Sequence, residues 1–341
     1  MKKRYHLSFN EFIRDLKKLV KPHYFASMWP IAGIMIIFLV LSFIIGYFAR
    51  GILSSMGIAM MMVMYGMVSA GALLMGVLEL VIAIALFFAL SFFYSFFTIS
   101  SSYTYQDKIR NPEQIVSAGS LWMHYKHVRK NQLWRILLYM ALFVILWTIP
   151  LSIVSSVFAS NKIVVLVCRI LNDLIIIWKE LEYSQAFFLY RDRQPQFLGQ
   201  SMRYALTASR RFMGGRKLNY LLVVILTVVL PIVVWTAIFG GLAYWGIYTA
   251  TAAFMYIGFA LIILGYAFYL PVIFAVTPLY YEKAKETANL DEDFAGVFKP
   301  VAELTGEAYV HEVYTPKKKA KKTKAKKQNK KKSEEKSKED K

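Results

Sequence analysis

Residues Ile163 to Tyr190 read IVVLVCRILNDLIIIWKELEYSQAFFLY, a run that is long and apolar enough to cross a lipid bilayer. The run nevertheless contains five charged residues. An ionisable group in hydrocarbon costs from about 2.5 to more than about 10 kcal/mol, so these side chains are expected to face protein, water or the membrane interface rather than lipid. The charged residues are Arg169, Asp173, Lys179, Glu180 and Glu182.

The composition of the whole chain excludes a soluble globular protein. Hydrophobic residues make up 57% of its 341 residues, and the mean hydropathy is +0.44. Apolar runs of roughly 20 residues, the length that crosses a hydrocarbon core of about 30 Å, recur through a predicted transmembrane domain at residues 28–281. We therefore predict an all-α polytopic membrane helix bundle with about six transmembrane helices. The predicted spans are residues 29–48, 70–97, 136–158, 163–190, 218–244 and 252–280.

Basic residues predict the orientation of these spans. Lysine and arginine are concentrated in the N-terminal segment, in the loops after the second and fourth spans, and in the C-terminal segment. The other loops have only Arg50 and Lys162 close to them. The positive-inside rule then places both termini in the cytoplasm, which requires an even number of spans. The expected location is the cell membrane, with a multi-pass topology.

The cytoplasmic N-terminal segment, residues 1–27, is predicted to contain an amphipathic helix. Residues 8–20 read SFNEFIRDLKKLV, with apolar residues at helical spacing and with Ser8 and Glu11 in a capping-box pattern. Two positions for this helix fit the pattern equally well. It could lie on the membrane surface, or it could pack on the cytoplasmic ends of the spans.

Glycine and proline mark the places where the spans are expected to depart from straight helices. Residues 51–69 are rich in glycine and methionine, so we predict a reentrant or interfacial lead-in to the second span, with a further span as the alternative. Ala72 and Gly76 form a small-xxx-small pair that would permit close helix approach. Prolines within the last two spans imply kinks, tolerated where neighbouring helices satisfy the freed carbonyls. These prolines are Pro231, Pro271 and Pro278.

Three elements of the sequence stand out near the ends of predicted spans. They are Tyr183, Ser184, Ala186 and Phe187 followed by Asp192, then Ser209, Met213, Gly215 and Lys217, and finally Pro271 and Tyr281. These elements resemble the DUF975 family, uncharacterised multi-span membrane proteins of Gram-positive bacteria, and the likeness covers roughly residues 10 to 285. The family usually has a Pro-Gly pair before the first of these elements. Here Pro150 is followed by Leu151, and a long insertion follows. Since the family has no established activity, the resemblance implies an architecture and no catalytic residues.

Four charged residues within the spans are candidates for a transport path. On one continuous helix Arg169, Asp173 and Glu180 share a face, and Arg169 can pair with Asp173 four residues later. With Glu79 of the second span they could line a polar cavity, because ionisable residues inside a membrane are functional candidates by default. The alternative is a salt-bridge network that only fixes helix packing. Lys179, Glu180 and Glu182 could also simply reach the cytoplasmic interface, where Lys179 can pair with Glu182.

Two polar clusters outside the spans could bind ligands. Gly214 and Gly215 lie among basic residues that could hold a lipid phosphate, although a glycine-capped helix end with basic anchors explains them as well. His124 and His127 have the spacing of metal ligands, but Cys168 is the only cysteine and no third ligand is evident, so interfacial side chains are preferred. No cofactor is predicted. The basic residues of the first cluster are Arg210, Arg211, Arg216 and Lys217.

The C-terminal segment changes composition twice. Residues 282–316 are acidic, whereas residues 317–341 contain fourteen lysines and no aromatic residue, so the latter are predicted to be disordered. A polybasic tail on the cytoplasmic side is attracted to anionic lipid, and ribosomal RNA offers an even denser array of phosphates. A solubilising tail with weak lipid contact is the alternative. The tail begins with the phosphate-binding candidates Lys317, Lys318, Lys319, Lys321 and Lys322.

The sequence favours a function without catalysis. It lacks the HExxH, G-x-S-x-G and Walker motifs, and every histidine lies outside the predicted spans. We predict a non-enzymatic membrane scaffold or accessory factor whose tail contacts anionic lipid or ribosomes. A small-solute or ion transporter that uses the four intramembrane charges is the alternative, although neither an inverted repeat nor paired broken helices are visible.

Overall fold

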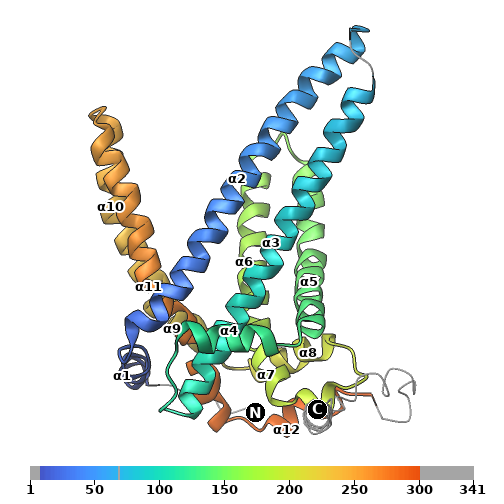
Figure 1. The fold of residues 1–341 in the computed structure, drawn as a ribbon. Helices are drawn as coiled ribbons and strands as arrows, with labels where there is room; N and C mark the ends of the chain where they lie inside the picture. Colours follow the sequence, from blue (N-terminus) through green and yellow to red (C-terminus); the bar gives the residue numbers. More distant parts are fainter. Residues whose placement is uncertain (1–7, 68–69, 300–341) are drawn as a thin grey trace, which may run out of the picture.

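The computed structural model describes residues 8–67 and 70–299, and all regular secondary structure in these residues is helical (Figure 1). This confirms the predicted all-α class. The long helices form three antiparallel hairpins, each pairing two neighbours in the chain. The hairpins are α2 (Tyr24–Met64) with α3 (Ala70–Arg110), α5 (Lys130–Val157) with α6 (Lys162–Tyr183), and α9 (Lys217–Val224), η2 (Ile225–Val229) and α10 (Leu230–Tyr248) with α11 (Ala252–Glu286).

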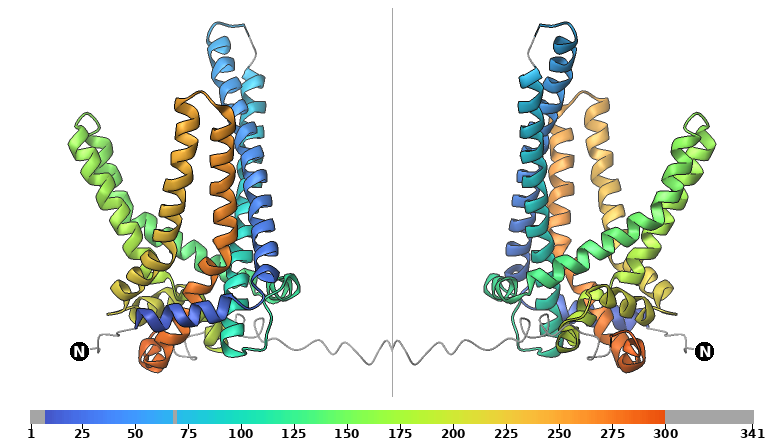
Figure 2. Two further views of the ribbon diagram at one scale, coloured as in Figure 1. Left: turned by 90° about the vertical axis from the view of Figure 1, so that its left-hand side faces the viewer. Right: turned by 90° about the vertical axis from the view of Figure 1, so that its right-hand side faces the viewer.

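The hairpins meet at one end and diverge toward their turns. In Figure 1 the α10–α11 hairpin leans away from the α2–α3 hairpin. In Figure 2 the α5–α6 hairpin leans away from these two hairpins. Short helices gather at the common end, which we call the base layer. It consists of α1 (Phe9–Val20), α4 (Ala118–His127), α7 (Ala186–Asp192), η1 (Gln194–Phe197), α8 (Arg203–Phe212) and α12 (Leu290–Phe294), with the adjoining ends of the long helices.

Five helical segments of the described chain are long and apolar enough to cross a membrane. Their most apolar windows are only 6% to 33% buried within the protein, so most of their apolar surface is left for lipid or for other helices. The remaining predicted span, the fourth, lies in α6, which is more charged but pairs with α5. The five segments are Tyr24–Met64, Leu73–Arg110, Lys130–Val157, Lys217–Tyr248 and Ala252–Glu286.

Two predicted boundaries are wrong. The predicted lead-in at residues 51–69 is not reentrant, because α2 continues without a break to Met64. Methionine and alanine are good helix formers, and they outweigh Gly51 and Gly57, the two glycines of this segment that lie within α2. The predicted fourth span at residues 163–190 is two helices, since α6 ends at Tyr183 and α7 starts at Ala186.

Helix α1 packs on protein and lies across the long helices at their base (Figure 2). Its apolar face buries Phe12 and Leu16 against the core that includes α11. Lys283 of α11 forms an ion pair of 2.5 Å with Asp15. Of the two predicted positions, the structure therefore favours packing on the ends of the spans. The expected capping box is absent here, because the Ser8 side chain makes no capping hydrogen bond.

A π-helical turn, η2, precedes Pro231 and shows how the last hairpin accommodates this residue. Proline has no N–H, so the carbonyl of Thr227, four residues earlier, loses its helical donor. The Tyr269 hydroxyl of α11 donates a hydrogen bond of 2.6 Å to that carbonyl. This confirms, for Pro231, the prediction that a neighbouring helix satisfies the freed group.

Glycines allow close helix contacts in two hairpins. A Cβ atom at Gly258 would lie 2.7 Å from the Phe239 carbonyl oxygen of α10, so only glycine fits there. A Cβ atom at Gly76 would lie 2.6 Å from Cγ of Met56, which confirms the close approach predicted at this residue. The side chain of Ala72, the other member of that pair, is outside the described set.

Candidate functional site

Charged side chains converge in the base layer, beginning with Glu182 at the end of α6. Its Oε2 accepts a hydrogen bond of 2.9 Å from Lys179 Nζ, and its Oε1 accepts one of 2.5 Å from Lys217 Nζ. The exposed fraction of the side chain is 5% for Glu182, 10% for Lys179 and 15% for Lys217. Each ammonium group also lies over a tryptophan ring, Lys179 over Trp147 and Lys217 over Trp178. The cluster of Glu182, Lys179 and Lys217, here called the Glu182 cluster, thus joins α6 to α9.

The break between α6 and α7 is held by Ser209 of α8. Its hydroxyl donates a hydrogen bond of 2.7 Å to the Glu182 carbonyl and accepts one of 3.3 Å from the Gln185 N–H. Backbone groups freed by the end of a helix need such partners when they are buried. Ser209 is fully buried. The turn that places Glu182 is therefore fixed by the neighbouring helix.

A second group of charges surrounds Asp192 at the end of α7. Its Oδ1 accepts a bond of 2.7 Å from Arg110, and its Oδ2 accepts bonds from Lys285 at 2.5 Å and from the Tyr281 hydroxyl at 2.9 Å. Arg110 also donates to Glu282 at 2.6 Å. This Asp192 cluster ties α3, α7 and α11 together.

Burial and hydrogen bonding act on Asp192 in opposite directions. Burial by itself would raise the pKa of the Asp192 carboxyl, because it disfavours the charged form. The hydrogen bonds from Lys285 and Arg110 outweigh burial and hold that pKa below its ordinary value. Asp192 is therefore ionised at neutral pH.

Arg191 directly precedes Asp192 in the chain. It donates hydrogen bonds to both carboxylate oxygens of Asp107, at 2.7 and 2.8 Å. Asp107 Oδ2 also lies 2.6 Å from His124 Nε2, and His124 Nδ1 lies 3.0 Å from the Ser120 carbonyl oxygen. Both ring nitrogens of His124 thus contact protein groups. In the described chain no three histidine, cysteine or acidic residues gather as a metal site would require.

The four intramembrane candidates do not come together. Glu79, Arg169, Asp173 and Glu180 are all exposed, and within the described ranges none of them forms an ion pair. The predicted pairing of Arg169 with Asp173 is therefore wrong for this structure. The predicted pairing of Lys179 with Glu182 at the end of this stretch is confirmed at 2.9 Å, and both side chains are buried there.

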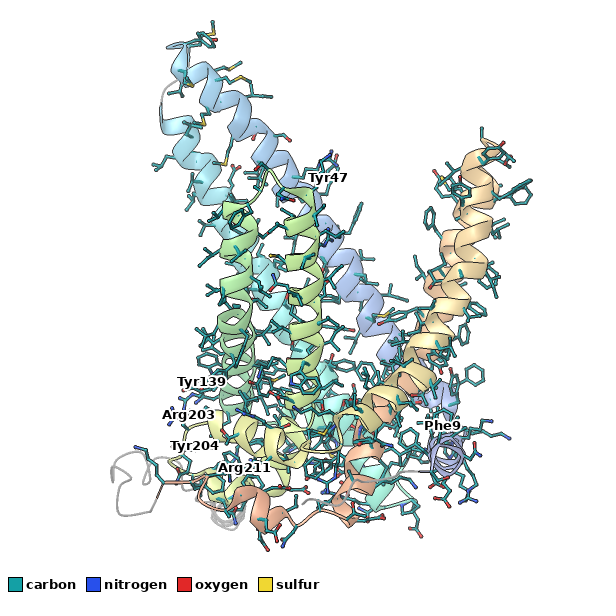
Figure 3. The ribbon with its side chains drawn as sticks, turned by 180° about the vertical axis from the view of Figure 1, so that it is seen from behind. Phe9, Tyr47, Tyr139, Arg203, Tyr204 and Arg211 are labelled. Atoms are coloured by element: carbon teal, nitrogen blue, oxygen red, sulfur yellow. The ribbon has the colours of Figure 1, made fainter. Side chains whose placement is uncertain are left out.

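The predicted basic cluster is largely engaged within the protein. Arg211 donates to the Ala295 carbonyl at 2.7 Å, the buried Arg216 donates to the Phe212 carbonyl at 2.6 Å, and Lys217 belongs to the Glu182 cluster. Figure 3 shows Arg211 in the base layer, on the side where α12 lies. Gly215 has a φ of +79°, a left-handed conformation typical of a helix end. The contacts favour the helix-cap interpretation, with Arg210 left exposed.

The tail candidates Lys317, Lys318, Lys319, Lys321 and Lys322 lie outside the described residues, as do residues 300–316 of the acidic segment. The residues on which the family resemblance depends do meet in the base layer. Tyr281 bonds Asp192, and Ser209 spans the turn after Tyr183.

Sequence reasoning missed the partners that complete these clusters. Arg110 and Glu282 lie in polar segments to which the sequence assigns no role, and Arg110 pairs with both Asp192 and Glu282, each more than 80 positions away. Hydrophobic spacing carries no signal for such a contact.

Comparisons of the chain with models of protein families, with curated proteins and with solved structures found no match. The functional interpretation therefore depends on the geometry of the base layer and of the long helices.

Proposed function

We propose that this protein is a non-enzymatic membrane scaffold or accessory factor, and that its base layer and lysine-rich tail lie in the cytoplasm. The observation that carries the proposal is the separation of polar and apolar surface. The charges of the Glu182 and Asp192 clusters are paired inside the base layer, whereas the long helices present apolar faces. The apolar faces of the long helices can then contact lipid and the helices of other membrane proteins. The basic charge of the tail lies on the cytoplasmic side.

The family resemblance supports the same architecture, and membership of the DUF975 family is part of the proposal. The convergence of Asp192, Tyr281, Ser209 and Lys217 gives the matching elements a common structural role. The transporter alternative stays a prediction from sequence. The positions of Glu79, Arg169, Asp173 and Glu180 give it no added support.

Deleting residues 317–341 is expected to lower binding to anionic vesicles or co-sedimentation with ribosomes, with the difference largest at low salt. Each lysine near an anionic leaflet contributes roughly 1 kcal/mol, and neutralising phosphates releases counterions. Binding is measured by sedimentation across a salt series. A full-length variant in which Glu334, Glu335, Glu339 and Asp340 become amides is the control, and it should bind more tightly. Unchanged binding of the deleted protein in both assays would refute the role of the tail.

A further inference from the structure

Two adjoining pockets, which share three lining residues and are here together called the groove, lie between α1 and the α10–α11 hairpin. Its upper part, of about 490 Å³, lies between the start of α2 and the hairpin and is lined by residues that include Trp235 and Leu261. Its lower part, of about 580 Å³, lies between α1 and the hairpin and includes Lys17 and Lys21. Tyr24, Pro231 and Tyr269 line both parts. Figure 3 shows α1, marked by Phe9, at the foot of this hairpin.

Three polar side chains along the groove donate hydrogen bonds within the protein. The Tyr24 hydroxyl donates to the Phe268 carbonyl, Tyr269 donates to Thr227, and Trp235 Nε1 donates to the Leu261 carbonyl at 2.9 Å. Each of these rings therefore presents mainly its apolar body to the groove. The lining suits a hydrocarbon chain.

The lower mouth of the groove has the opposite character. Lys17 and Lys21 lie one helical turn apart, both are exposed, and neither is paired with an acidic side chain in the part of the chain that the structure describes. The nearby carboxylate of Asp15 is occupied by Lys283. Two free ammonium groups at the end of an apolar groove match an anionic headgroup attached to an acyl chain.

We propose that this groove binds one anionic phospholipid, with its phosphate between Lys17 and Lys21 and an acyl chain along Tyr24, Pro231 and Trp235. Helix α1 lies across the ends of the long helices, where the membrane interface is expected. The site lies within the described residues and does not depend on the lysine-rich tail. Its test therefore succeeds or fails separately from that of the proposed function.

The test uses the full-length protein in phosphatidylcholine nanodiscs that contain phosphatidylglycerol with a photoreactive diazirine at the end of an acyl chain. Cross-linked peptides are mapped by mass spectrometry. Labelling should concentrate on groove-lining peptides of α10 and α11. The double variant Lys17→Gln/Lys21→Gln should lower it by about 30-fold, because two headgroup contacts are lost. The same probe on phosphatidylcholine should label these peptides weakly.

Matched variants separate the groove from general attraction to the membrane. The double variant Arg14→Gln/Lys18→Gln removes two charges at the same spacing from α1, outside the groove, and should leave the labelling unchanged. Thr236→Trp, which fills the groove, should reduce labelling, whereas Val233→Trp on the exposed face of α10 should not. Equal loss with both charge variants, or labelling spread evenly over all the long helices, would overturn the site.

Discussion

Replacing Glu182 with glutamine is expected to destabilise the folded protein by about 3 kcal/mol, because breaking a buried ion pair leaves unpaired charge in the interior. Lys179 and Lys217 would then face each other without the carboxylate that both contact, and both are largely shielded from water. The Ser209 contact would persist, since it involves the Glu182 backbone. The free energy of unfolding is measured by equilibrium denaturation in detergent micelles.

Glu180 provides a matched control two residues away. It lies on the same helix but is exposed, and within the described chain it forms no ion pair. Glu180→Gln should therefore change the free energy of unfolding by no more than about 0.5 kcal/mol. If both variants lost the same stability, the Glu182 cluster would have no special role in holding the base layer.

Asp192→Asn is expected to destabilise the protein by a similar amount at neutral pH, and this cost should disappear in acid. Arg110, Lys285 and Tyr281 all donate to the Asp192 carboxylate. The pKa of Asp192 is lowered in the folded protein, so the ionised carboxylate stabilises the fold above the unfolded pKa of about 3.9. This stabilisation is lost as the pH falls through the folded pKa.

The measurement is the difference in unfolding free energy between the original protein and the Asn variant from pH 7 to pH 3. The difference should be largest at pH 7 and should shrink below about pH 4. Asp291→Asn is the control, because its side chain is 81% exposed although it pairs with Arg193. An exposed pair contributes about 0 to 1 kcal/mol. A difference for Asp192 that stays constant over this range would contradict the assignment of a lowered pKa.

Hydropathy predicts the long helices well because the membrane imposes one simple requirement on them. Helix α1 and the six long helical segments all appear near the predicted residues. The exact ends were harder to predict, since helix α2 extends to Met64 through a segment whose glycines suggested a break. In such a segment the helix-forming tendency of methionine and alanine decides the structure.

The orientation of charged side chains could not be predicted from one helix alone. Glu180 and Glu182 have the same chemistry and nearly the same position, yet only Glu182 is buried. The two residues lie on nearly opposite faces of α6, and the sequence of this helix does not show that the face of Glu182 meets Lys217, 35 residues later on another helix. The family resemblance did single out Lys217, Asp192 and Tyr281, but not the contacts that they make.

The most direct test of the account is the side of the membrane on which each hairpin turn lies. In a Cys168→Ala background, single cysteines are placed at exposed positions near the three turns, at Met67, Ser160 and Tyr248, and in the base layer at Lys126 and Asp291. Intact cells are then treated with a membrane-impermeant maleimide. We predict that all three turn positions react from outside and that both base positions react only after permeabilisation. Two results would contradict three membrane-crossing hairpins joined by a cytoplasmic base layer. One is protection of the cysteine at position 160 in intact cells, and the other is reaction of the cysteine at either base position before permeabilisation.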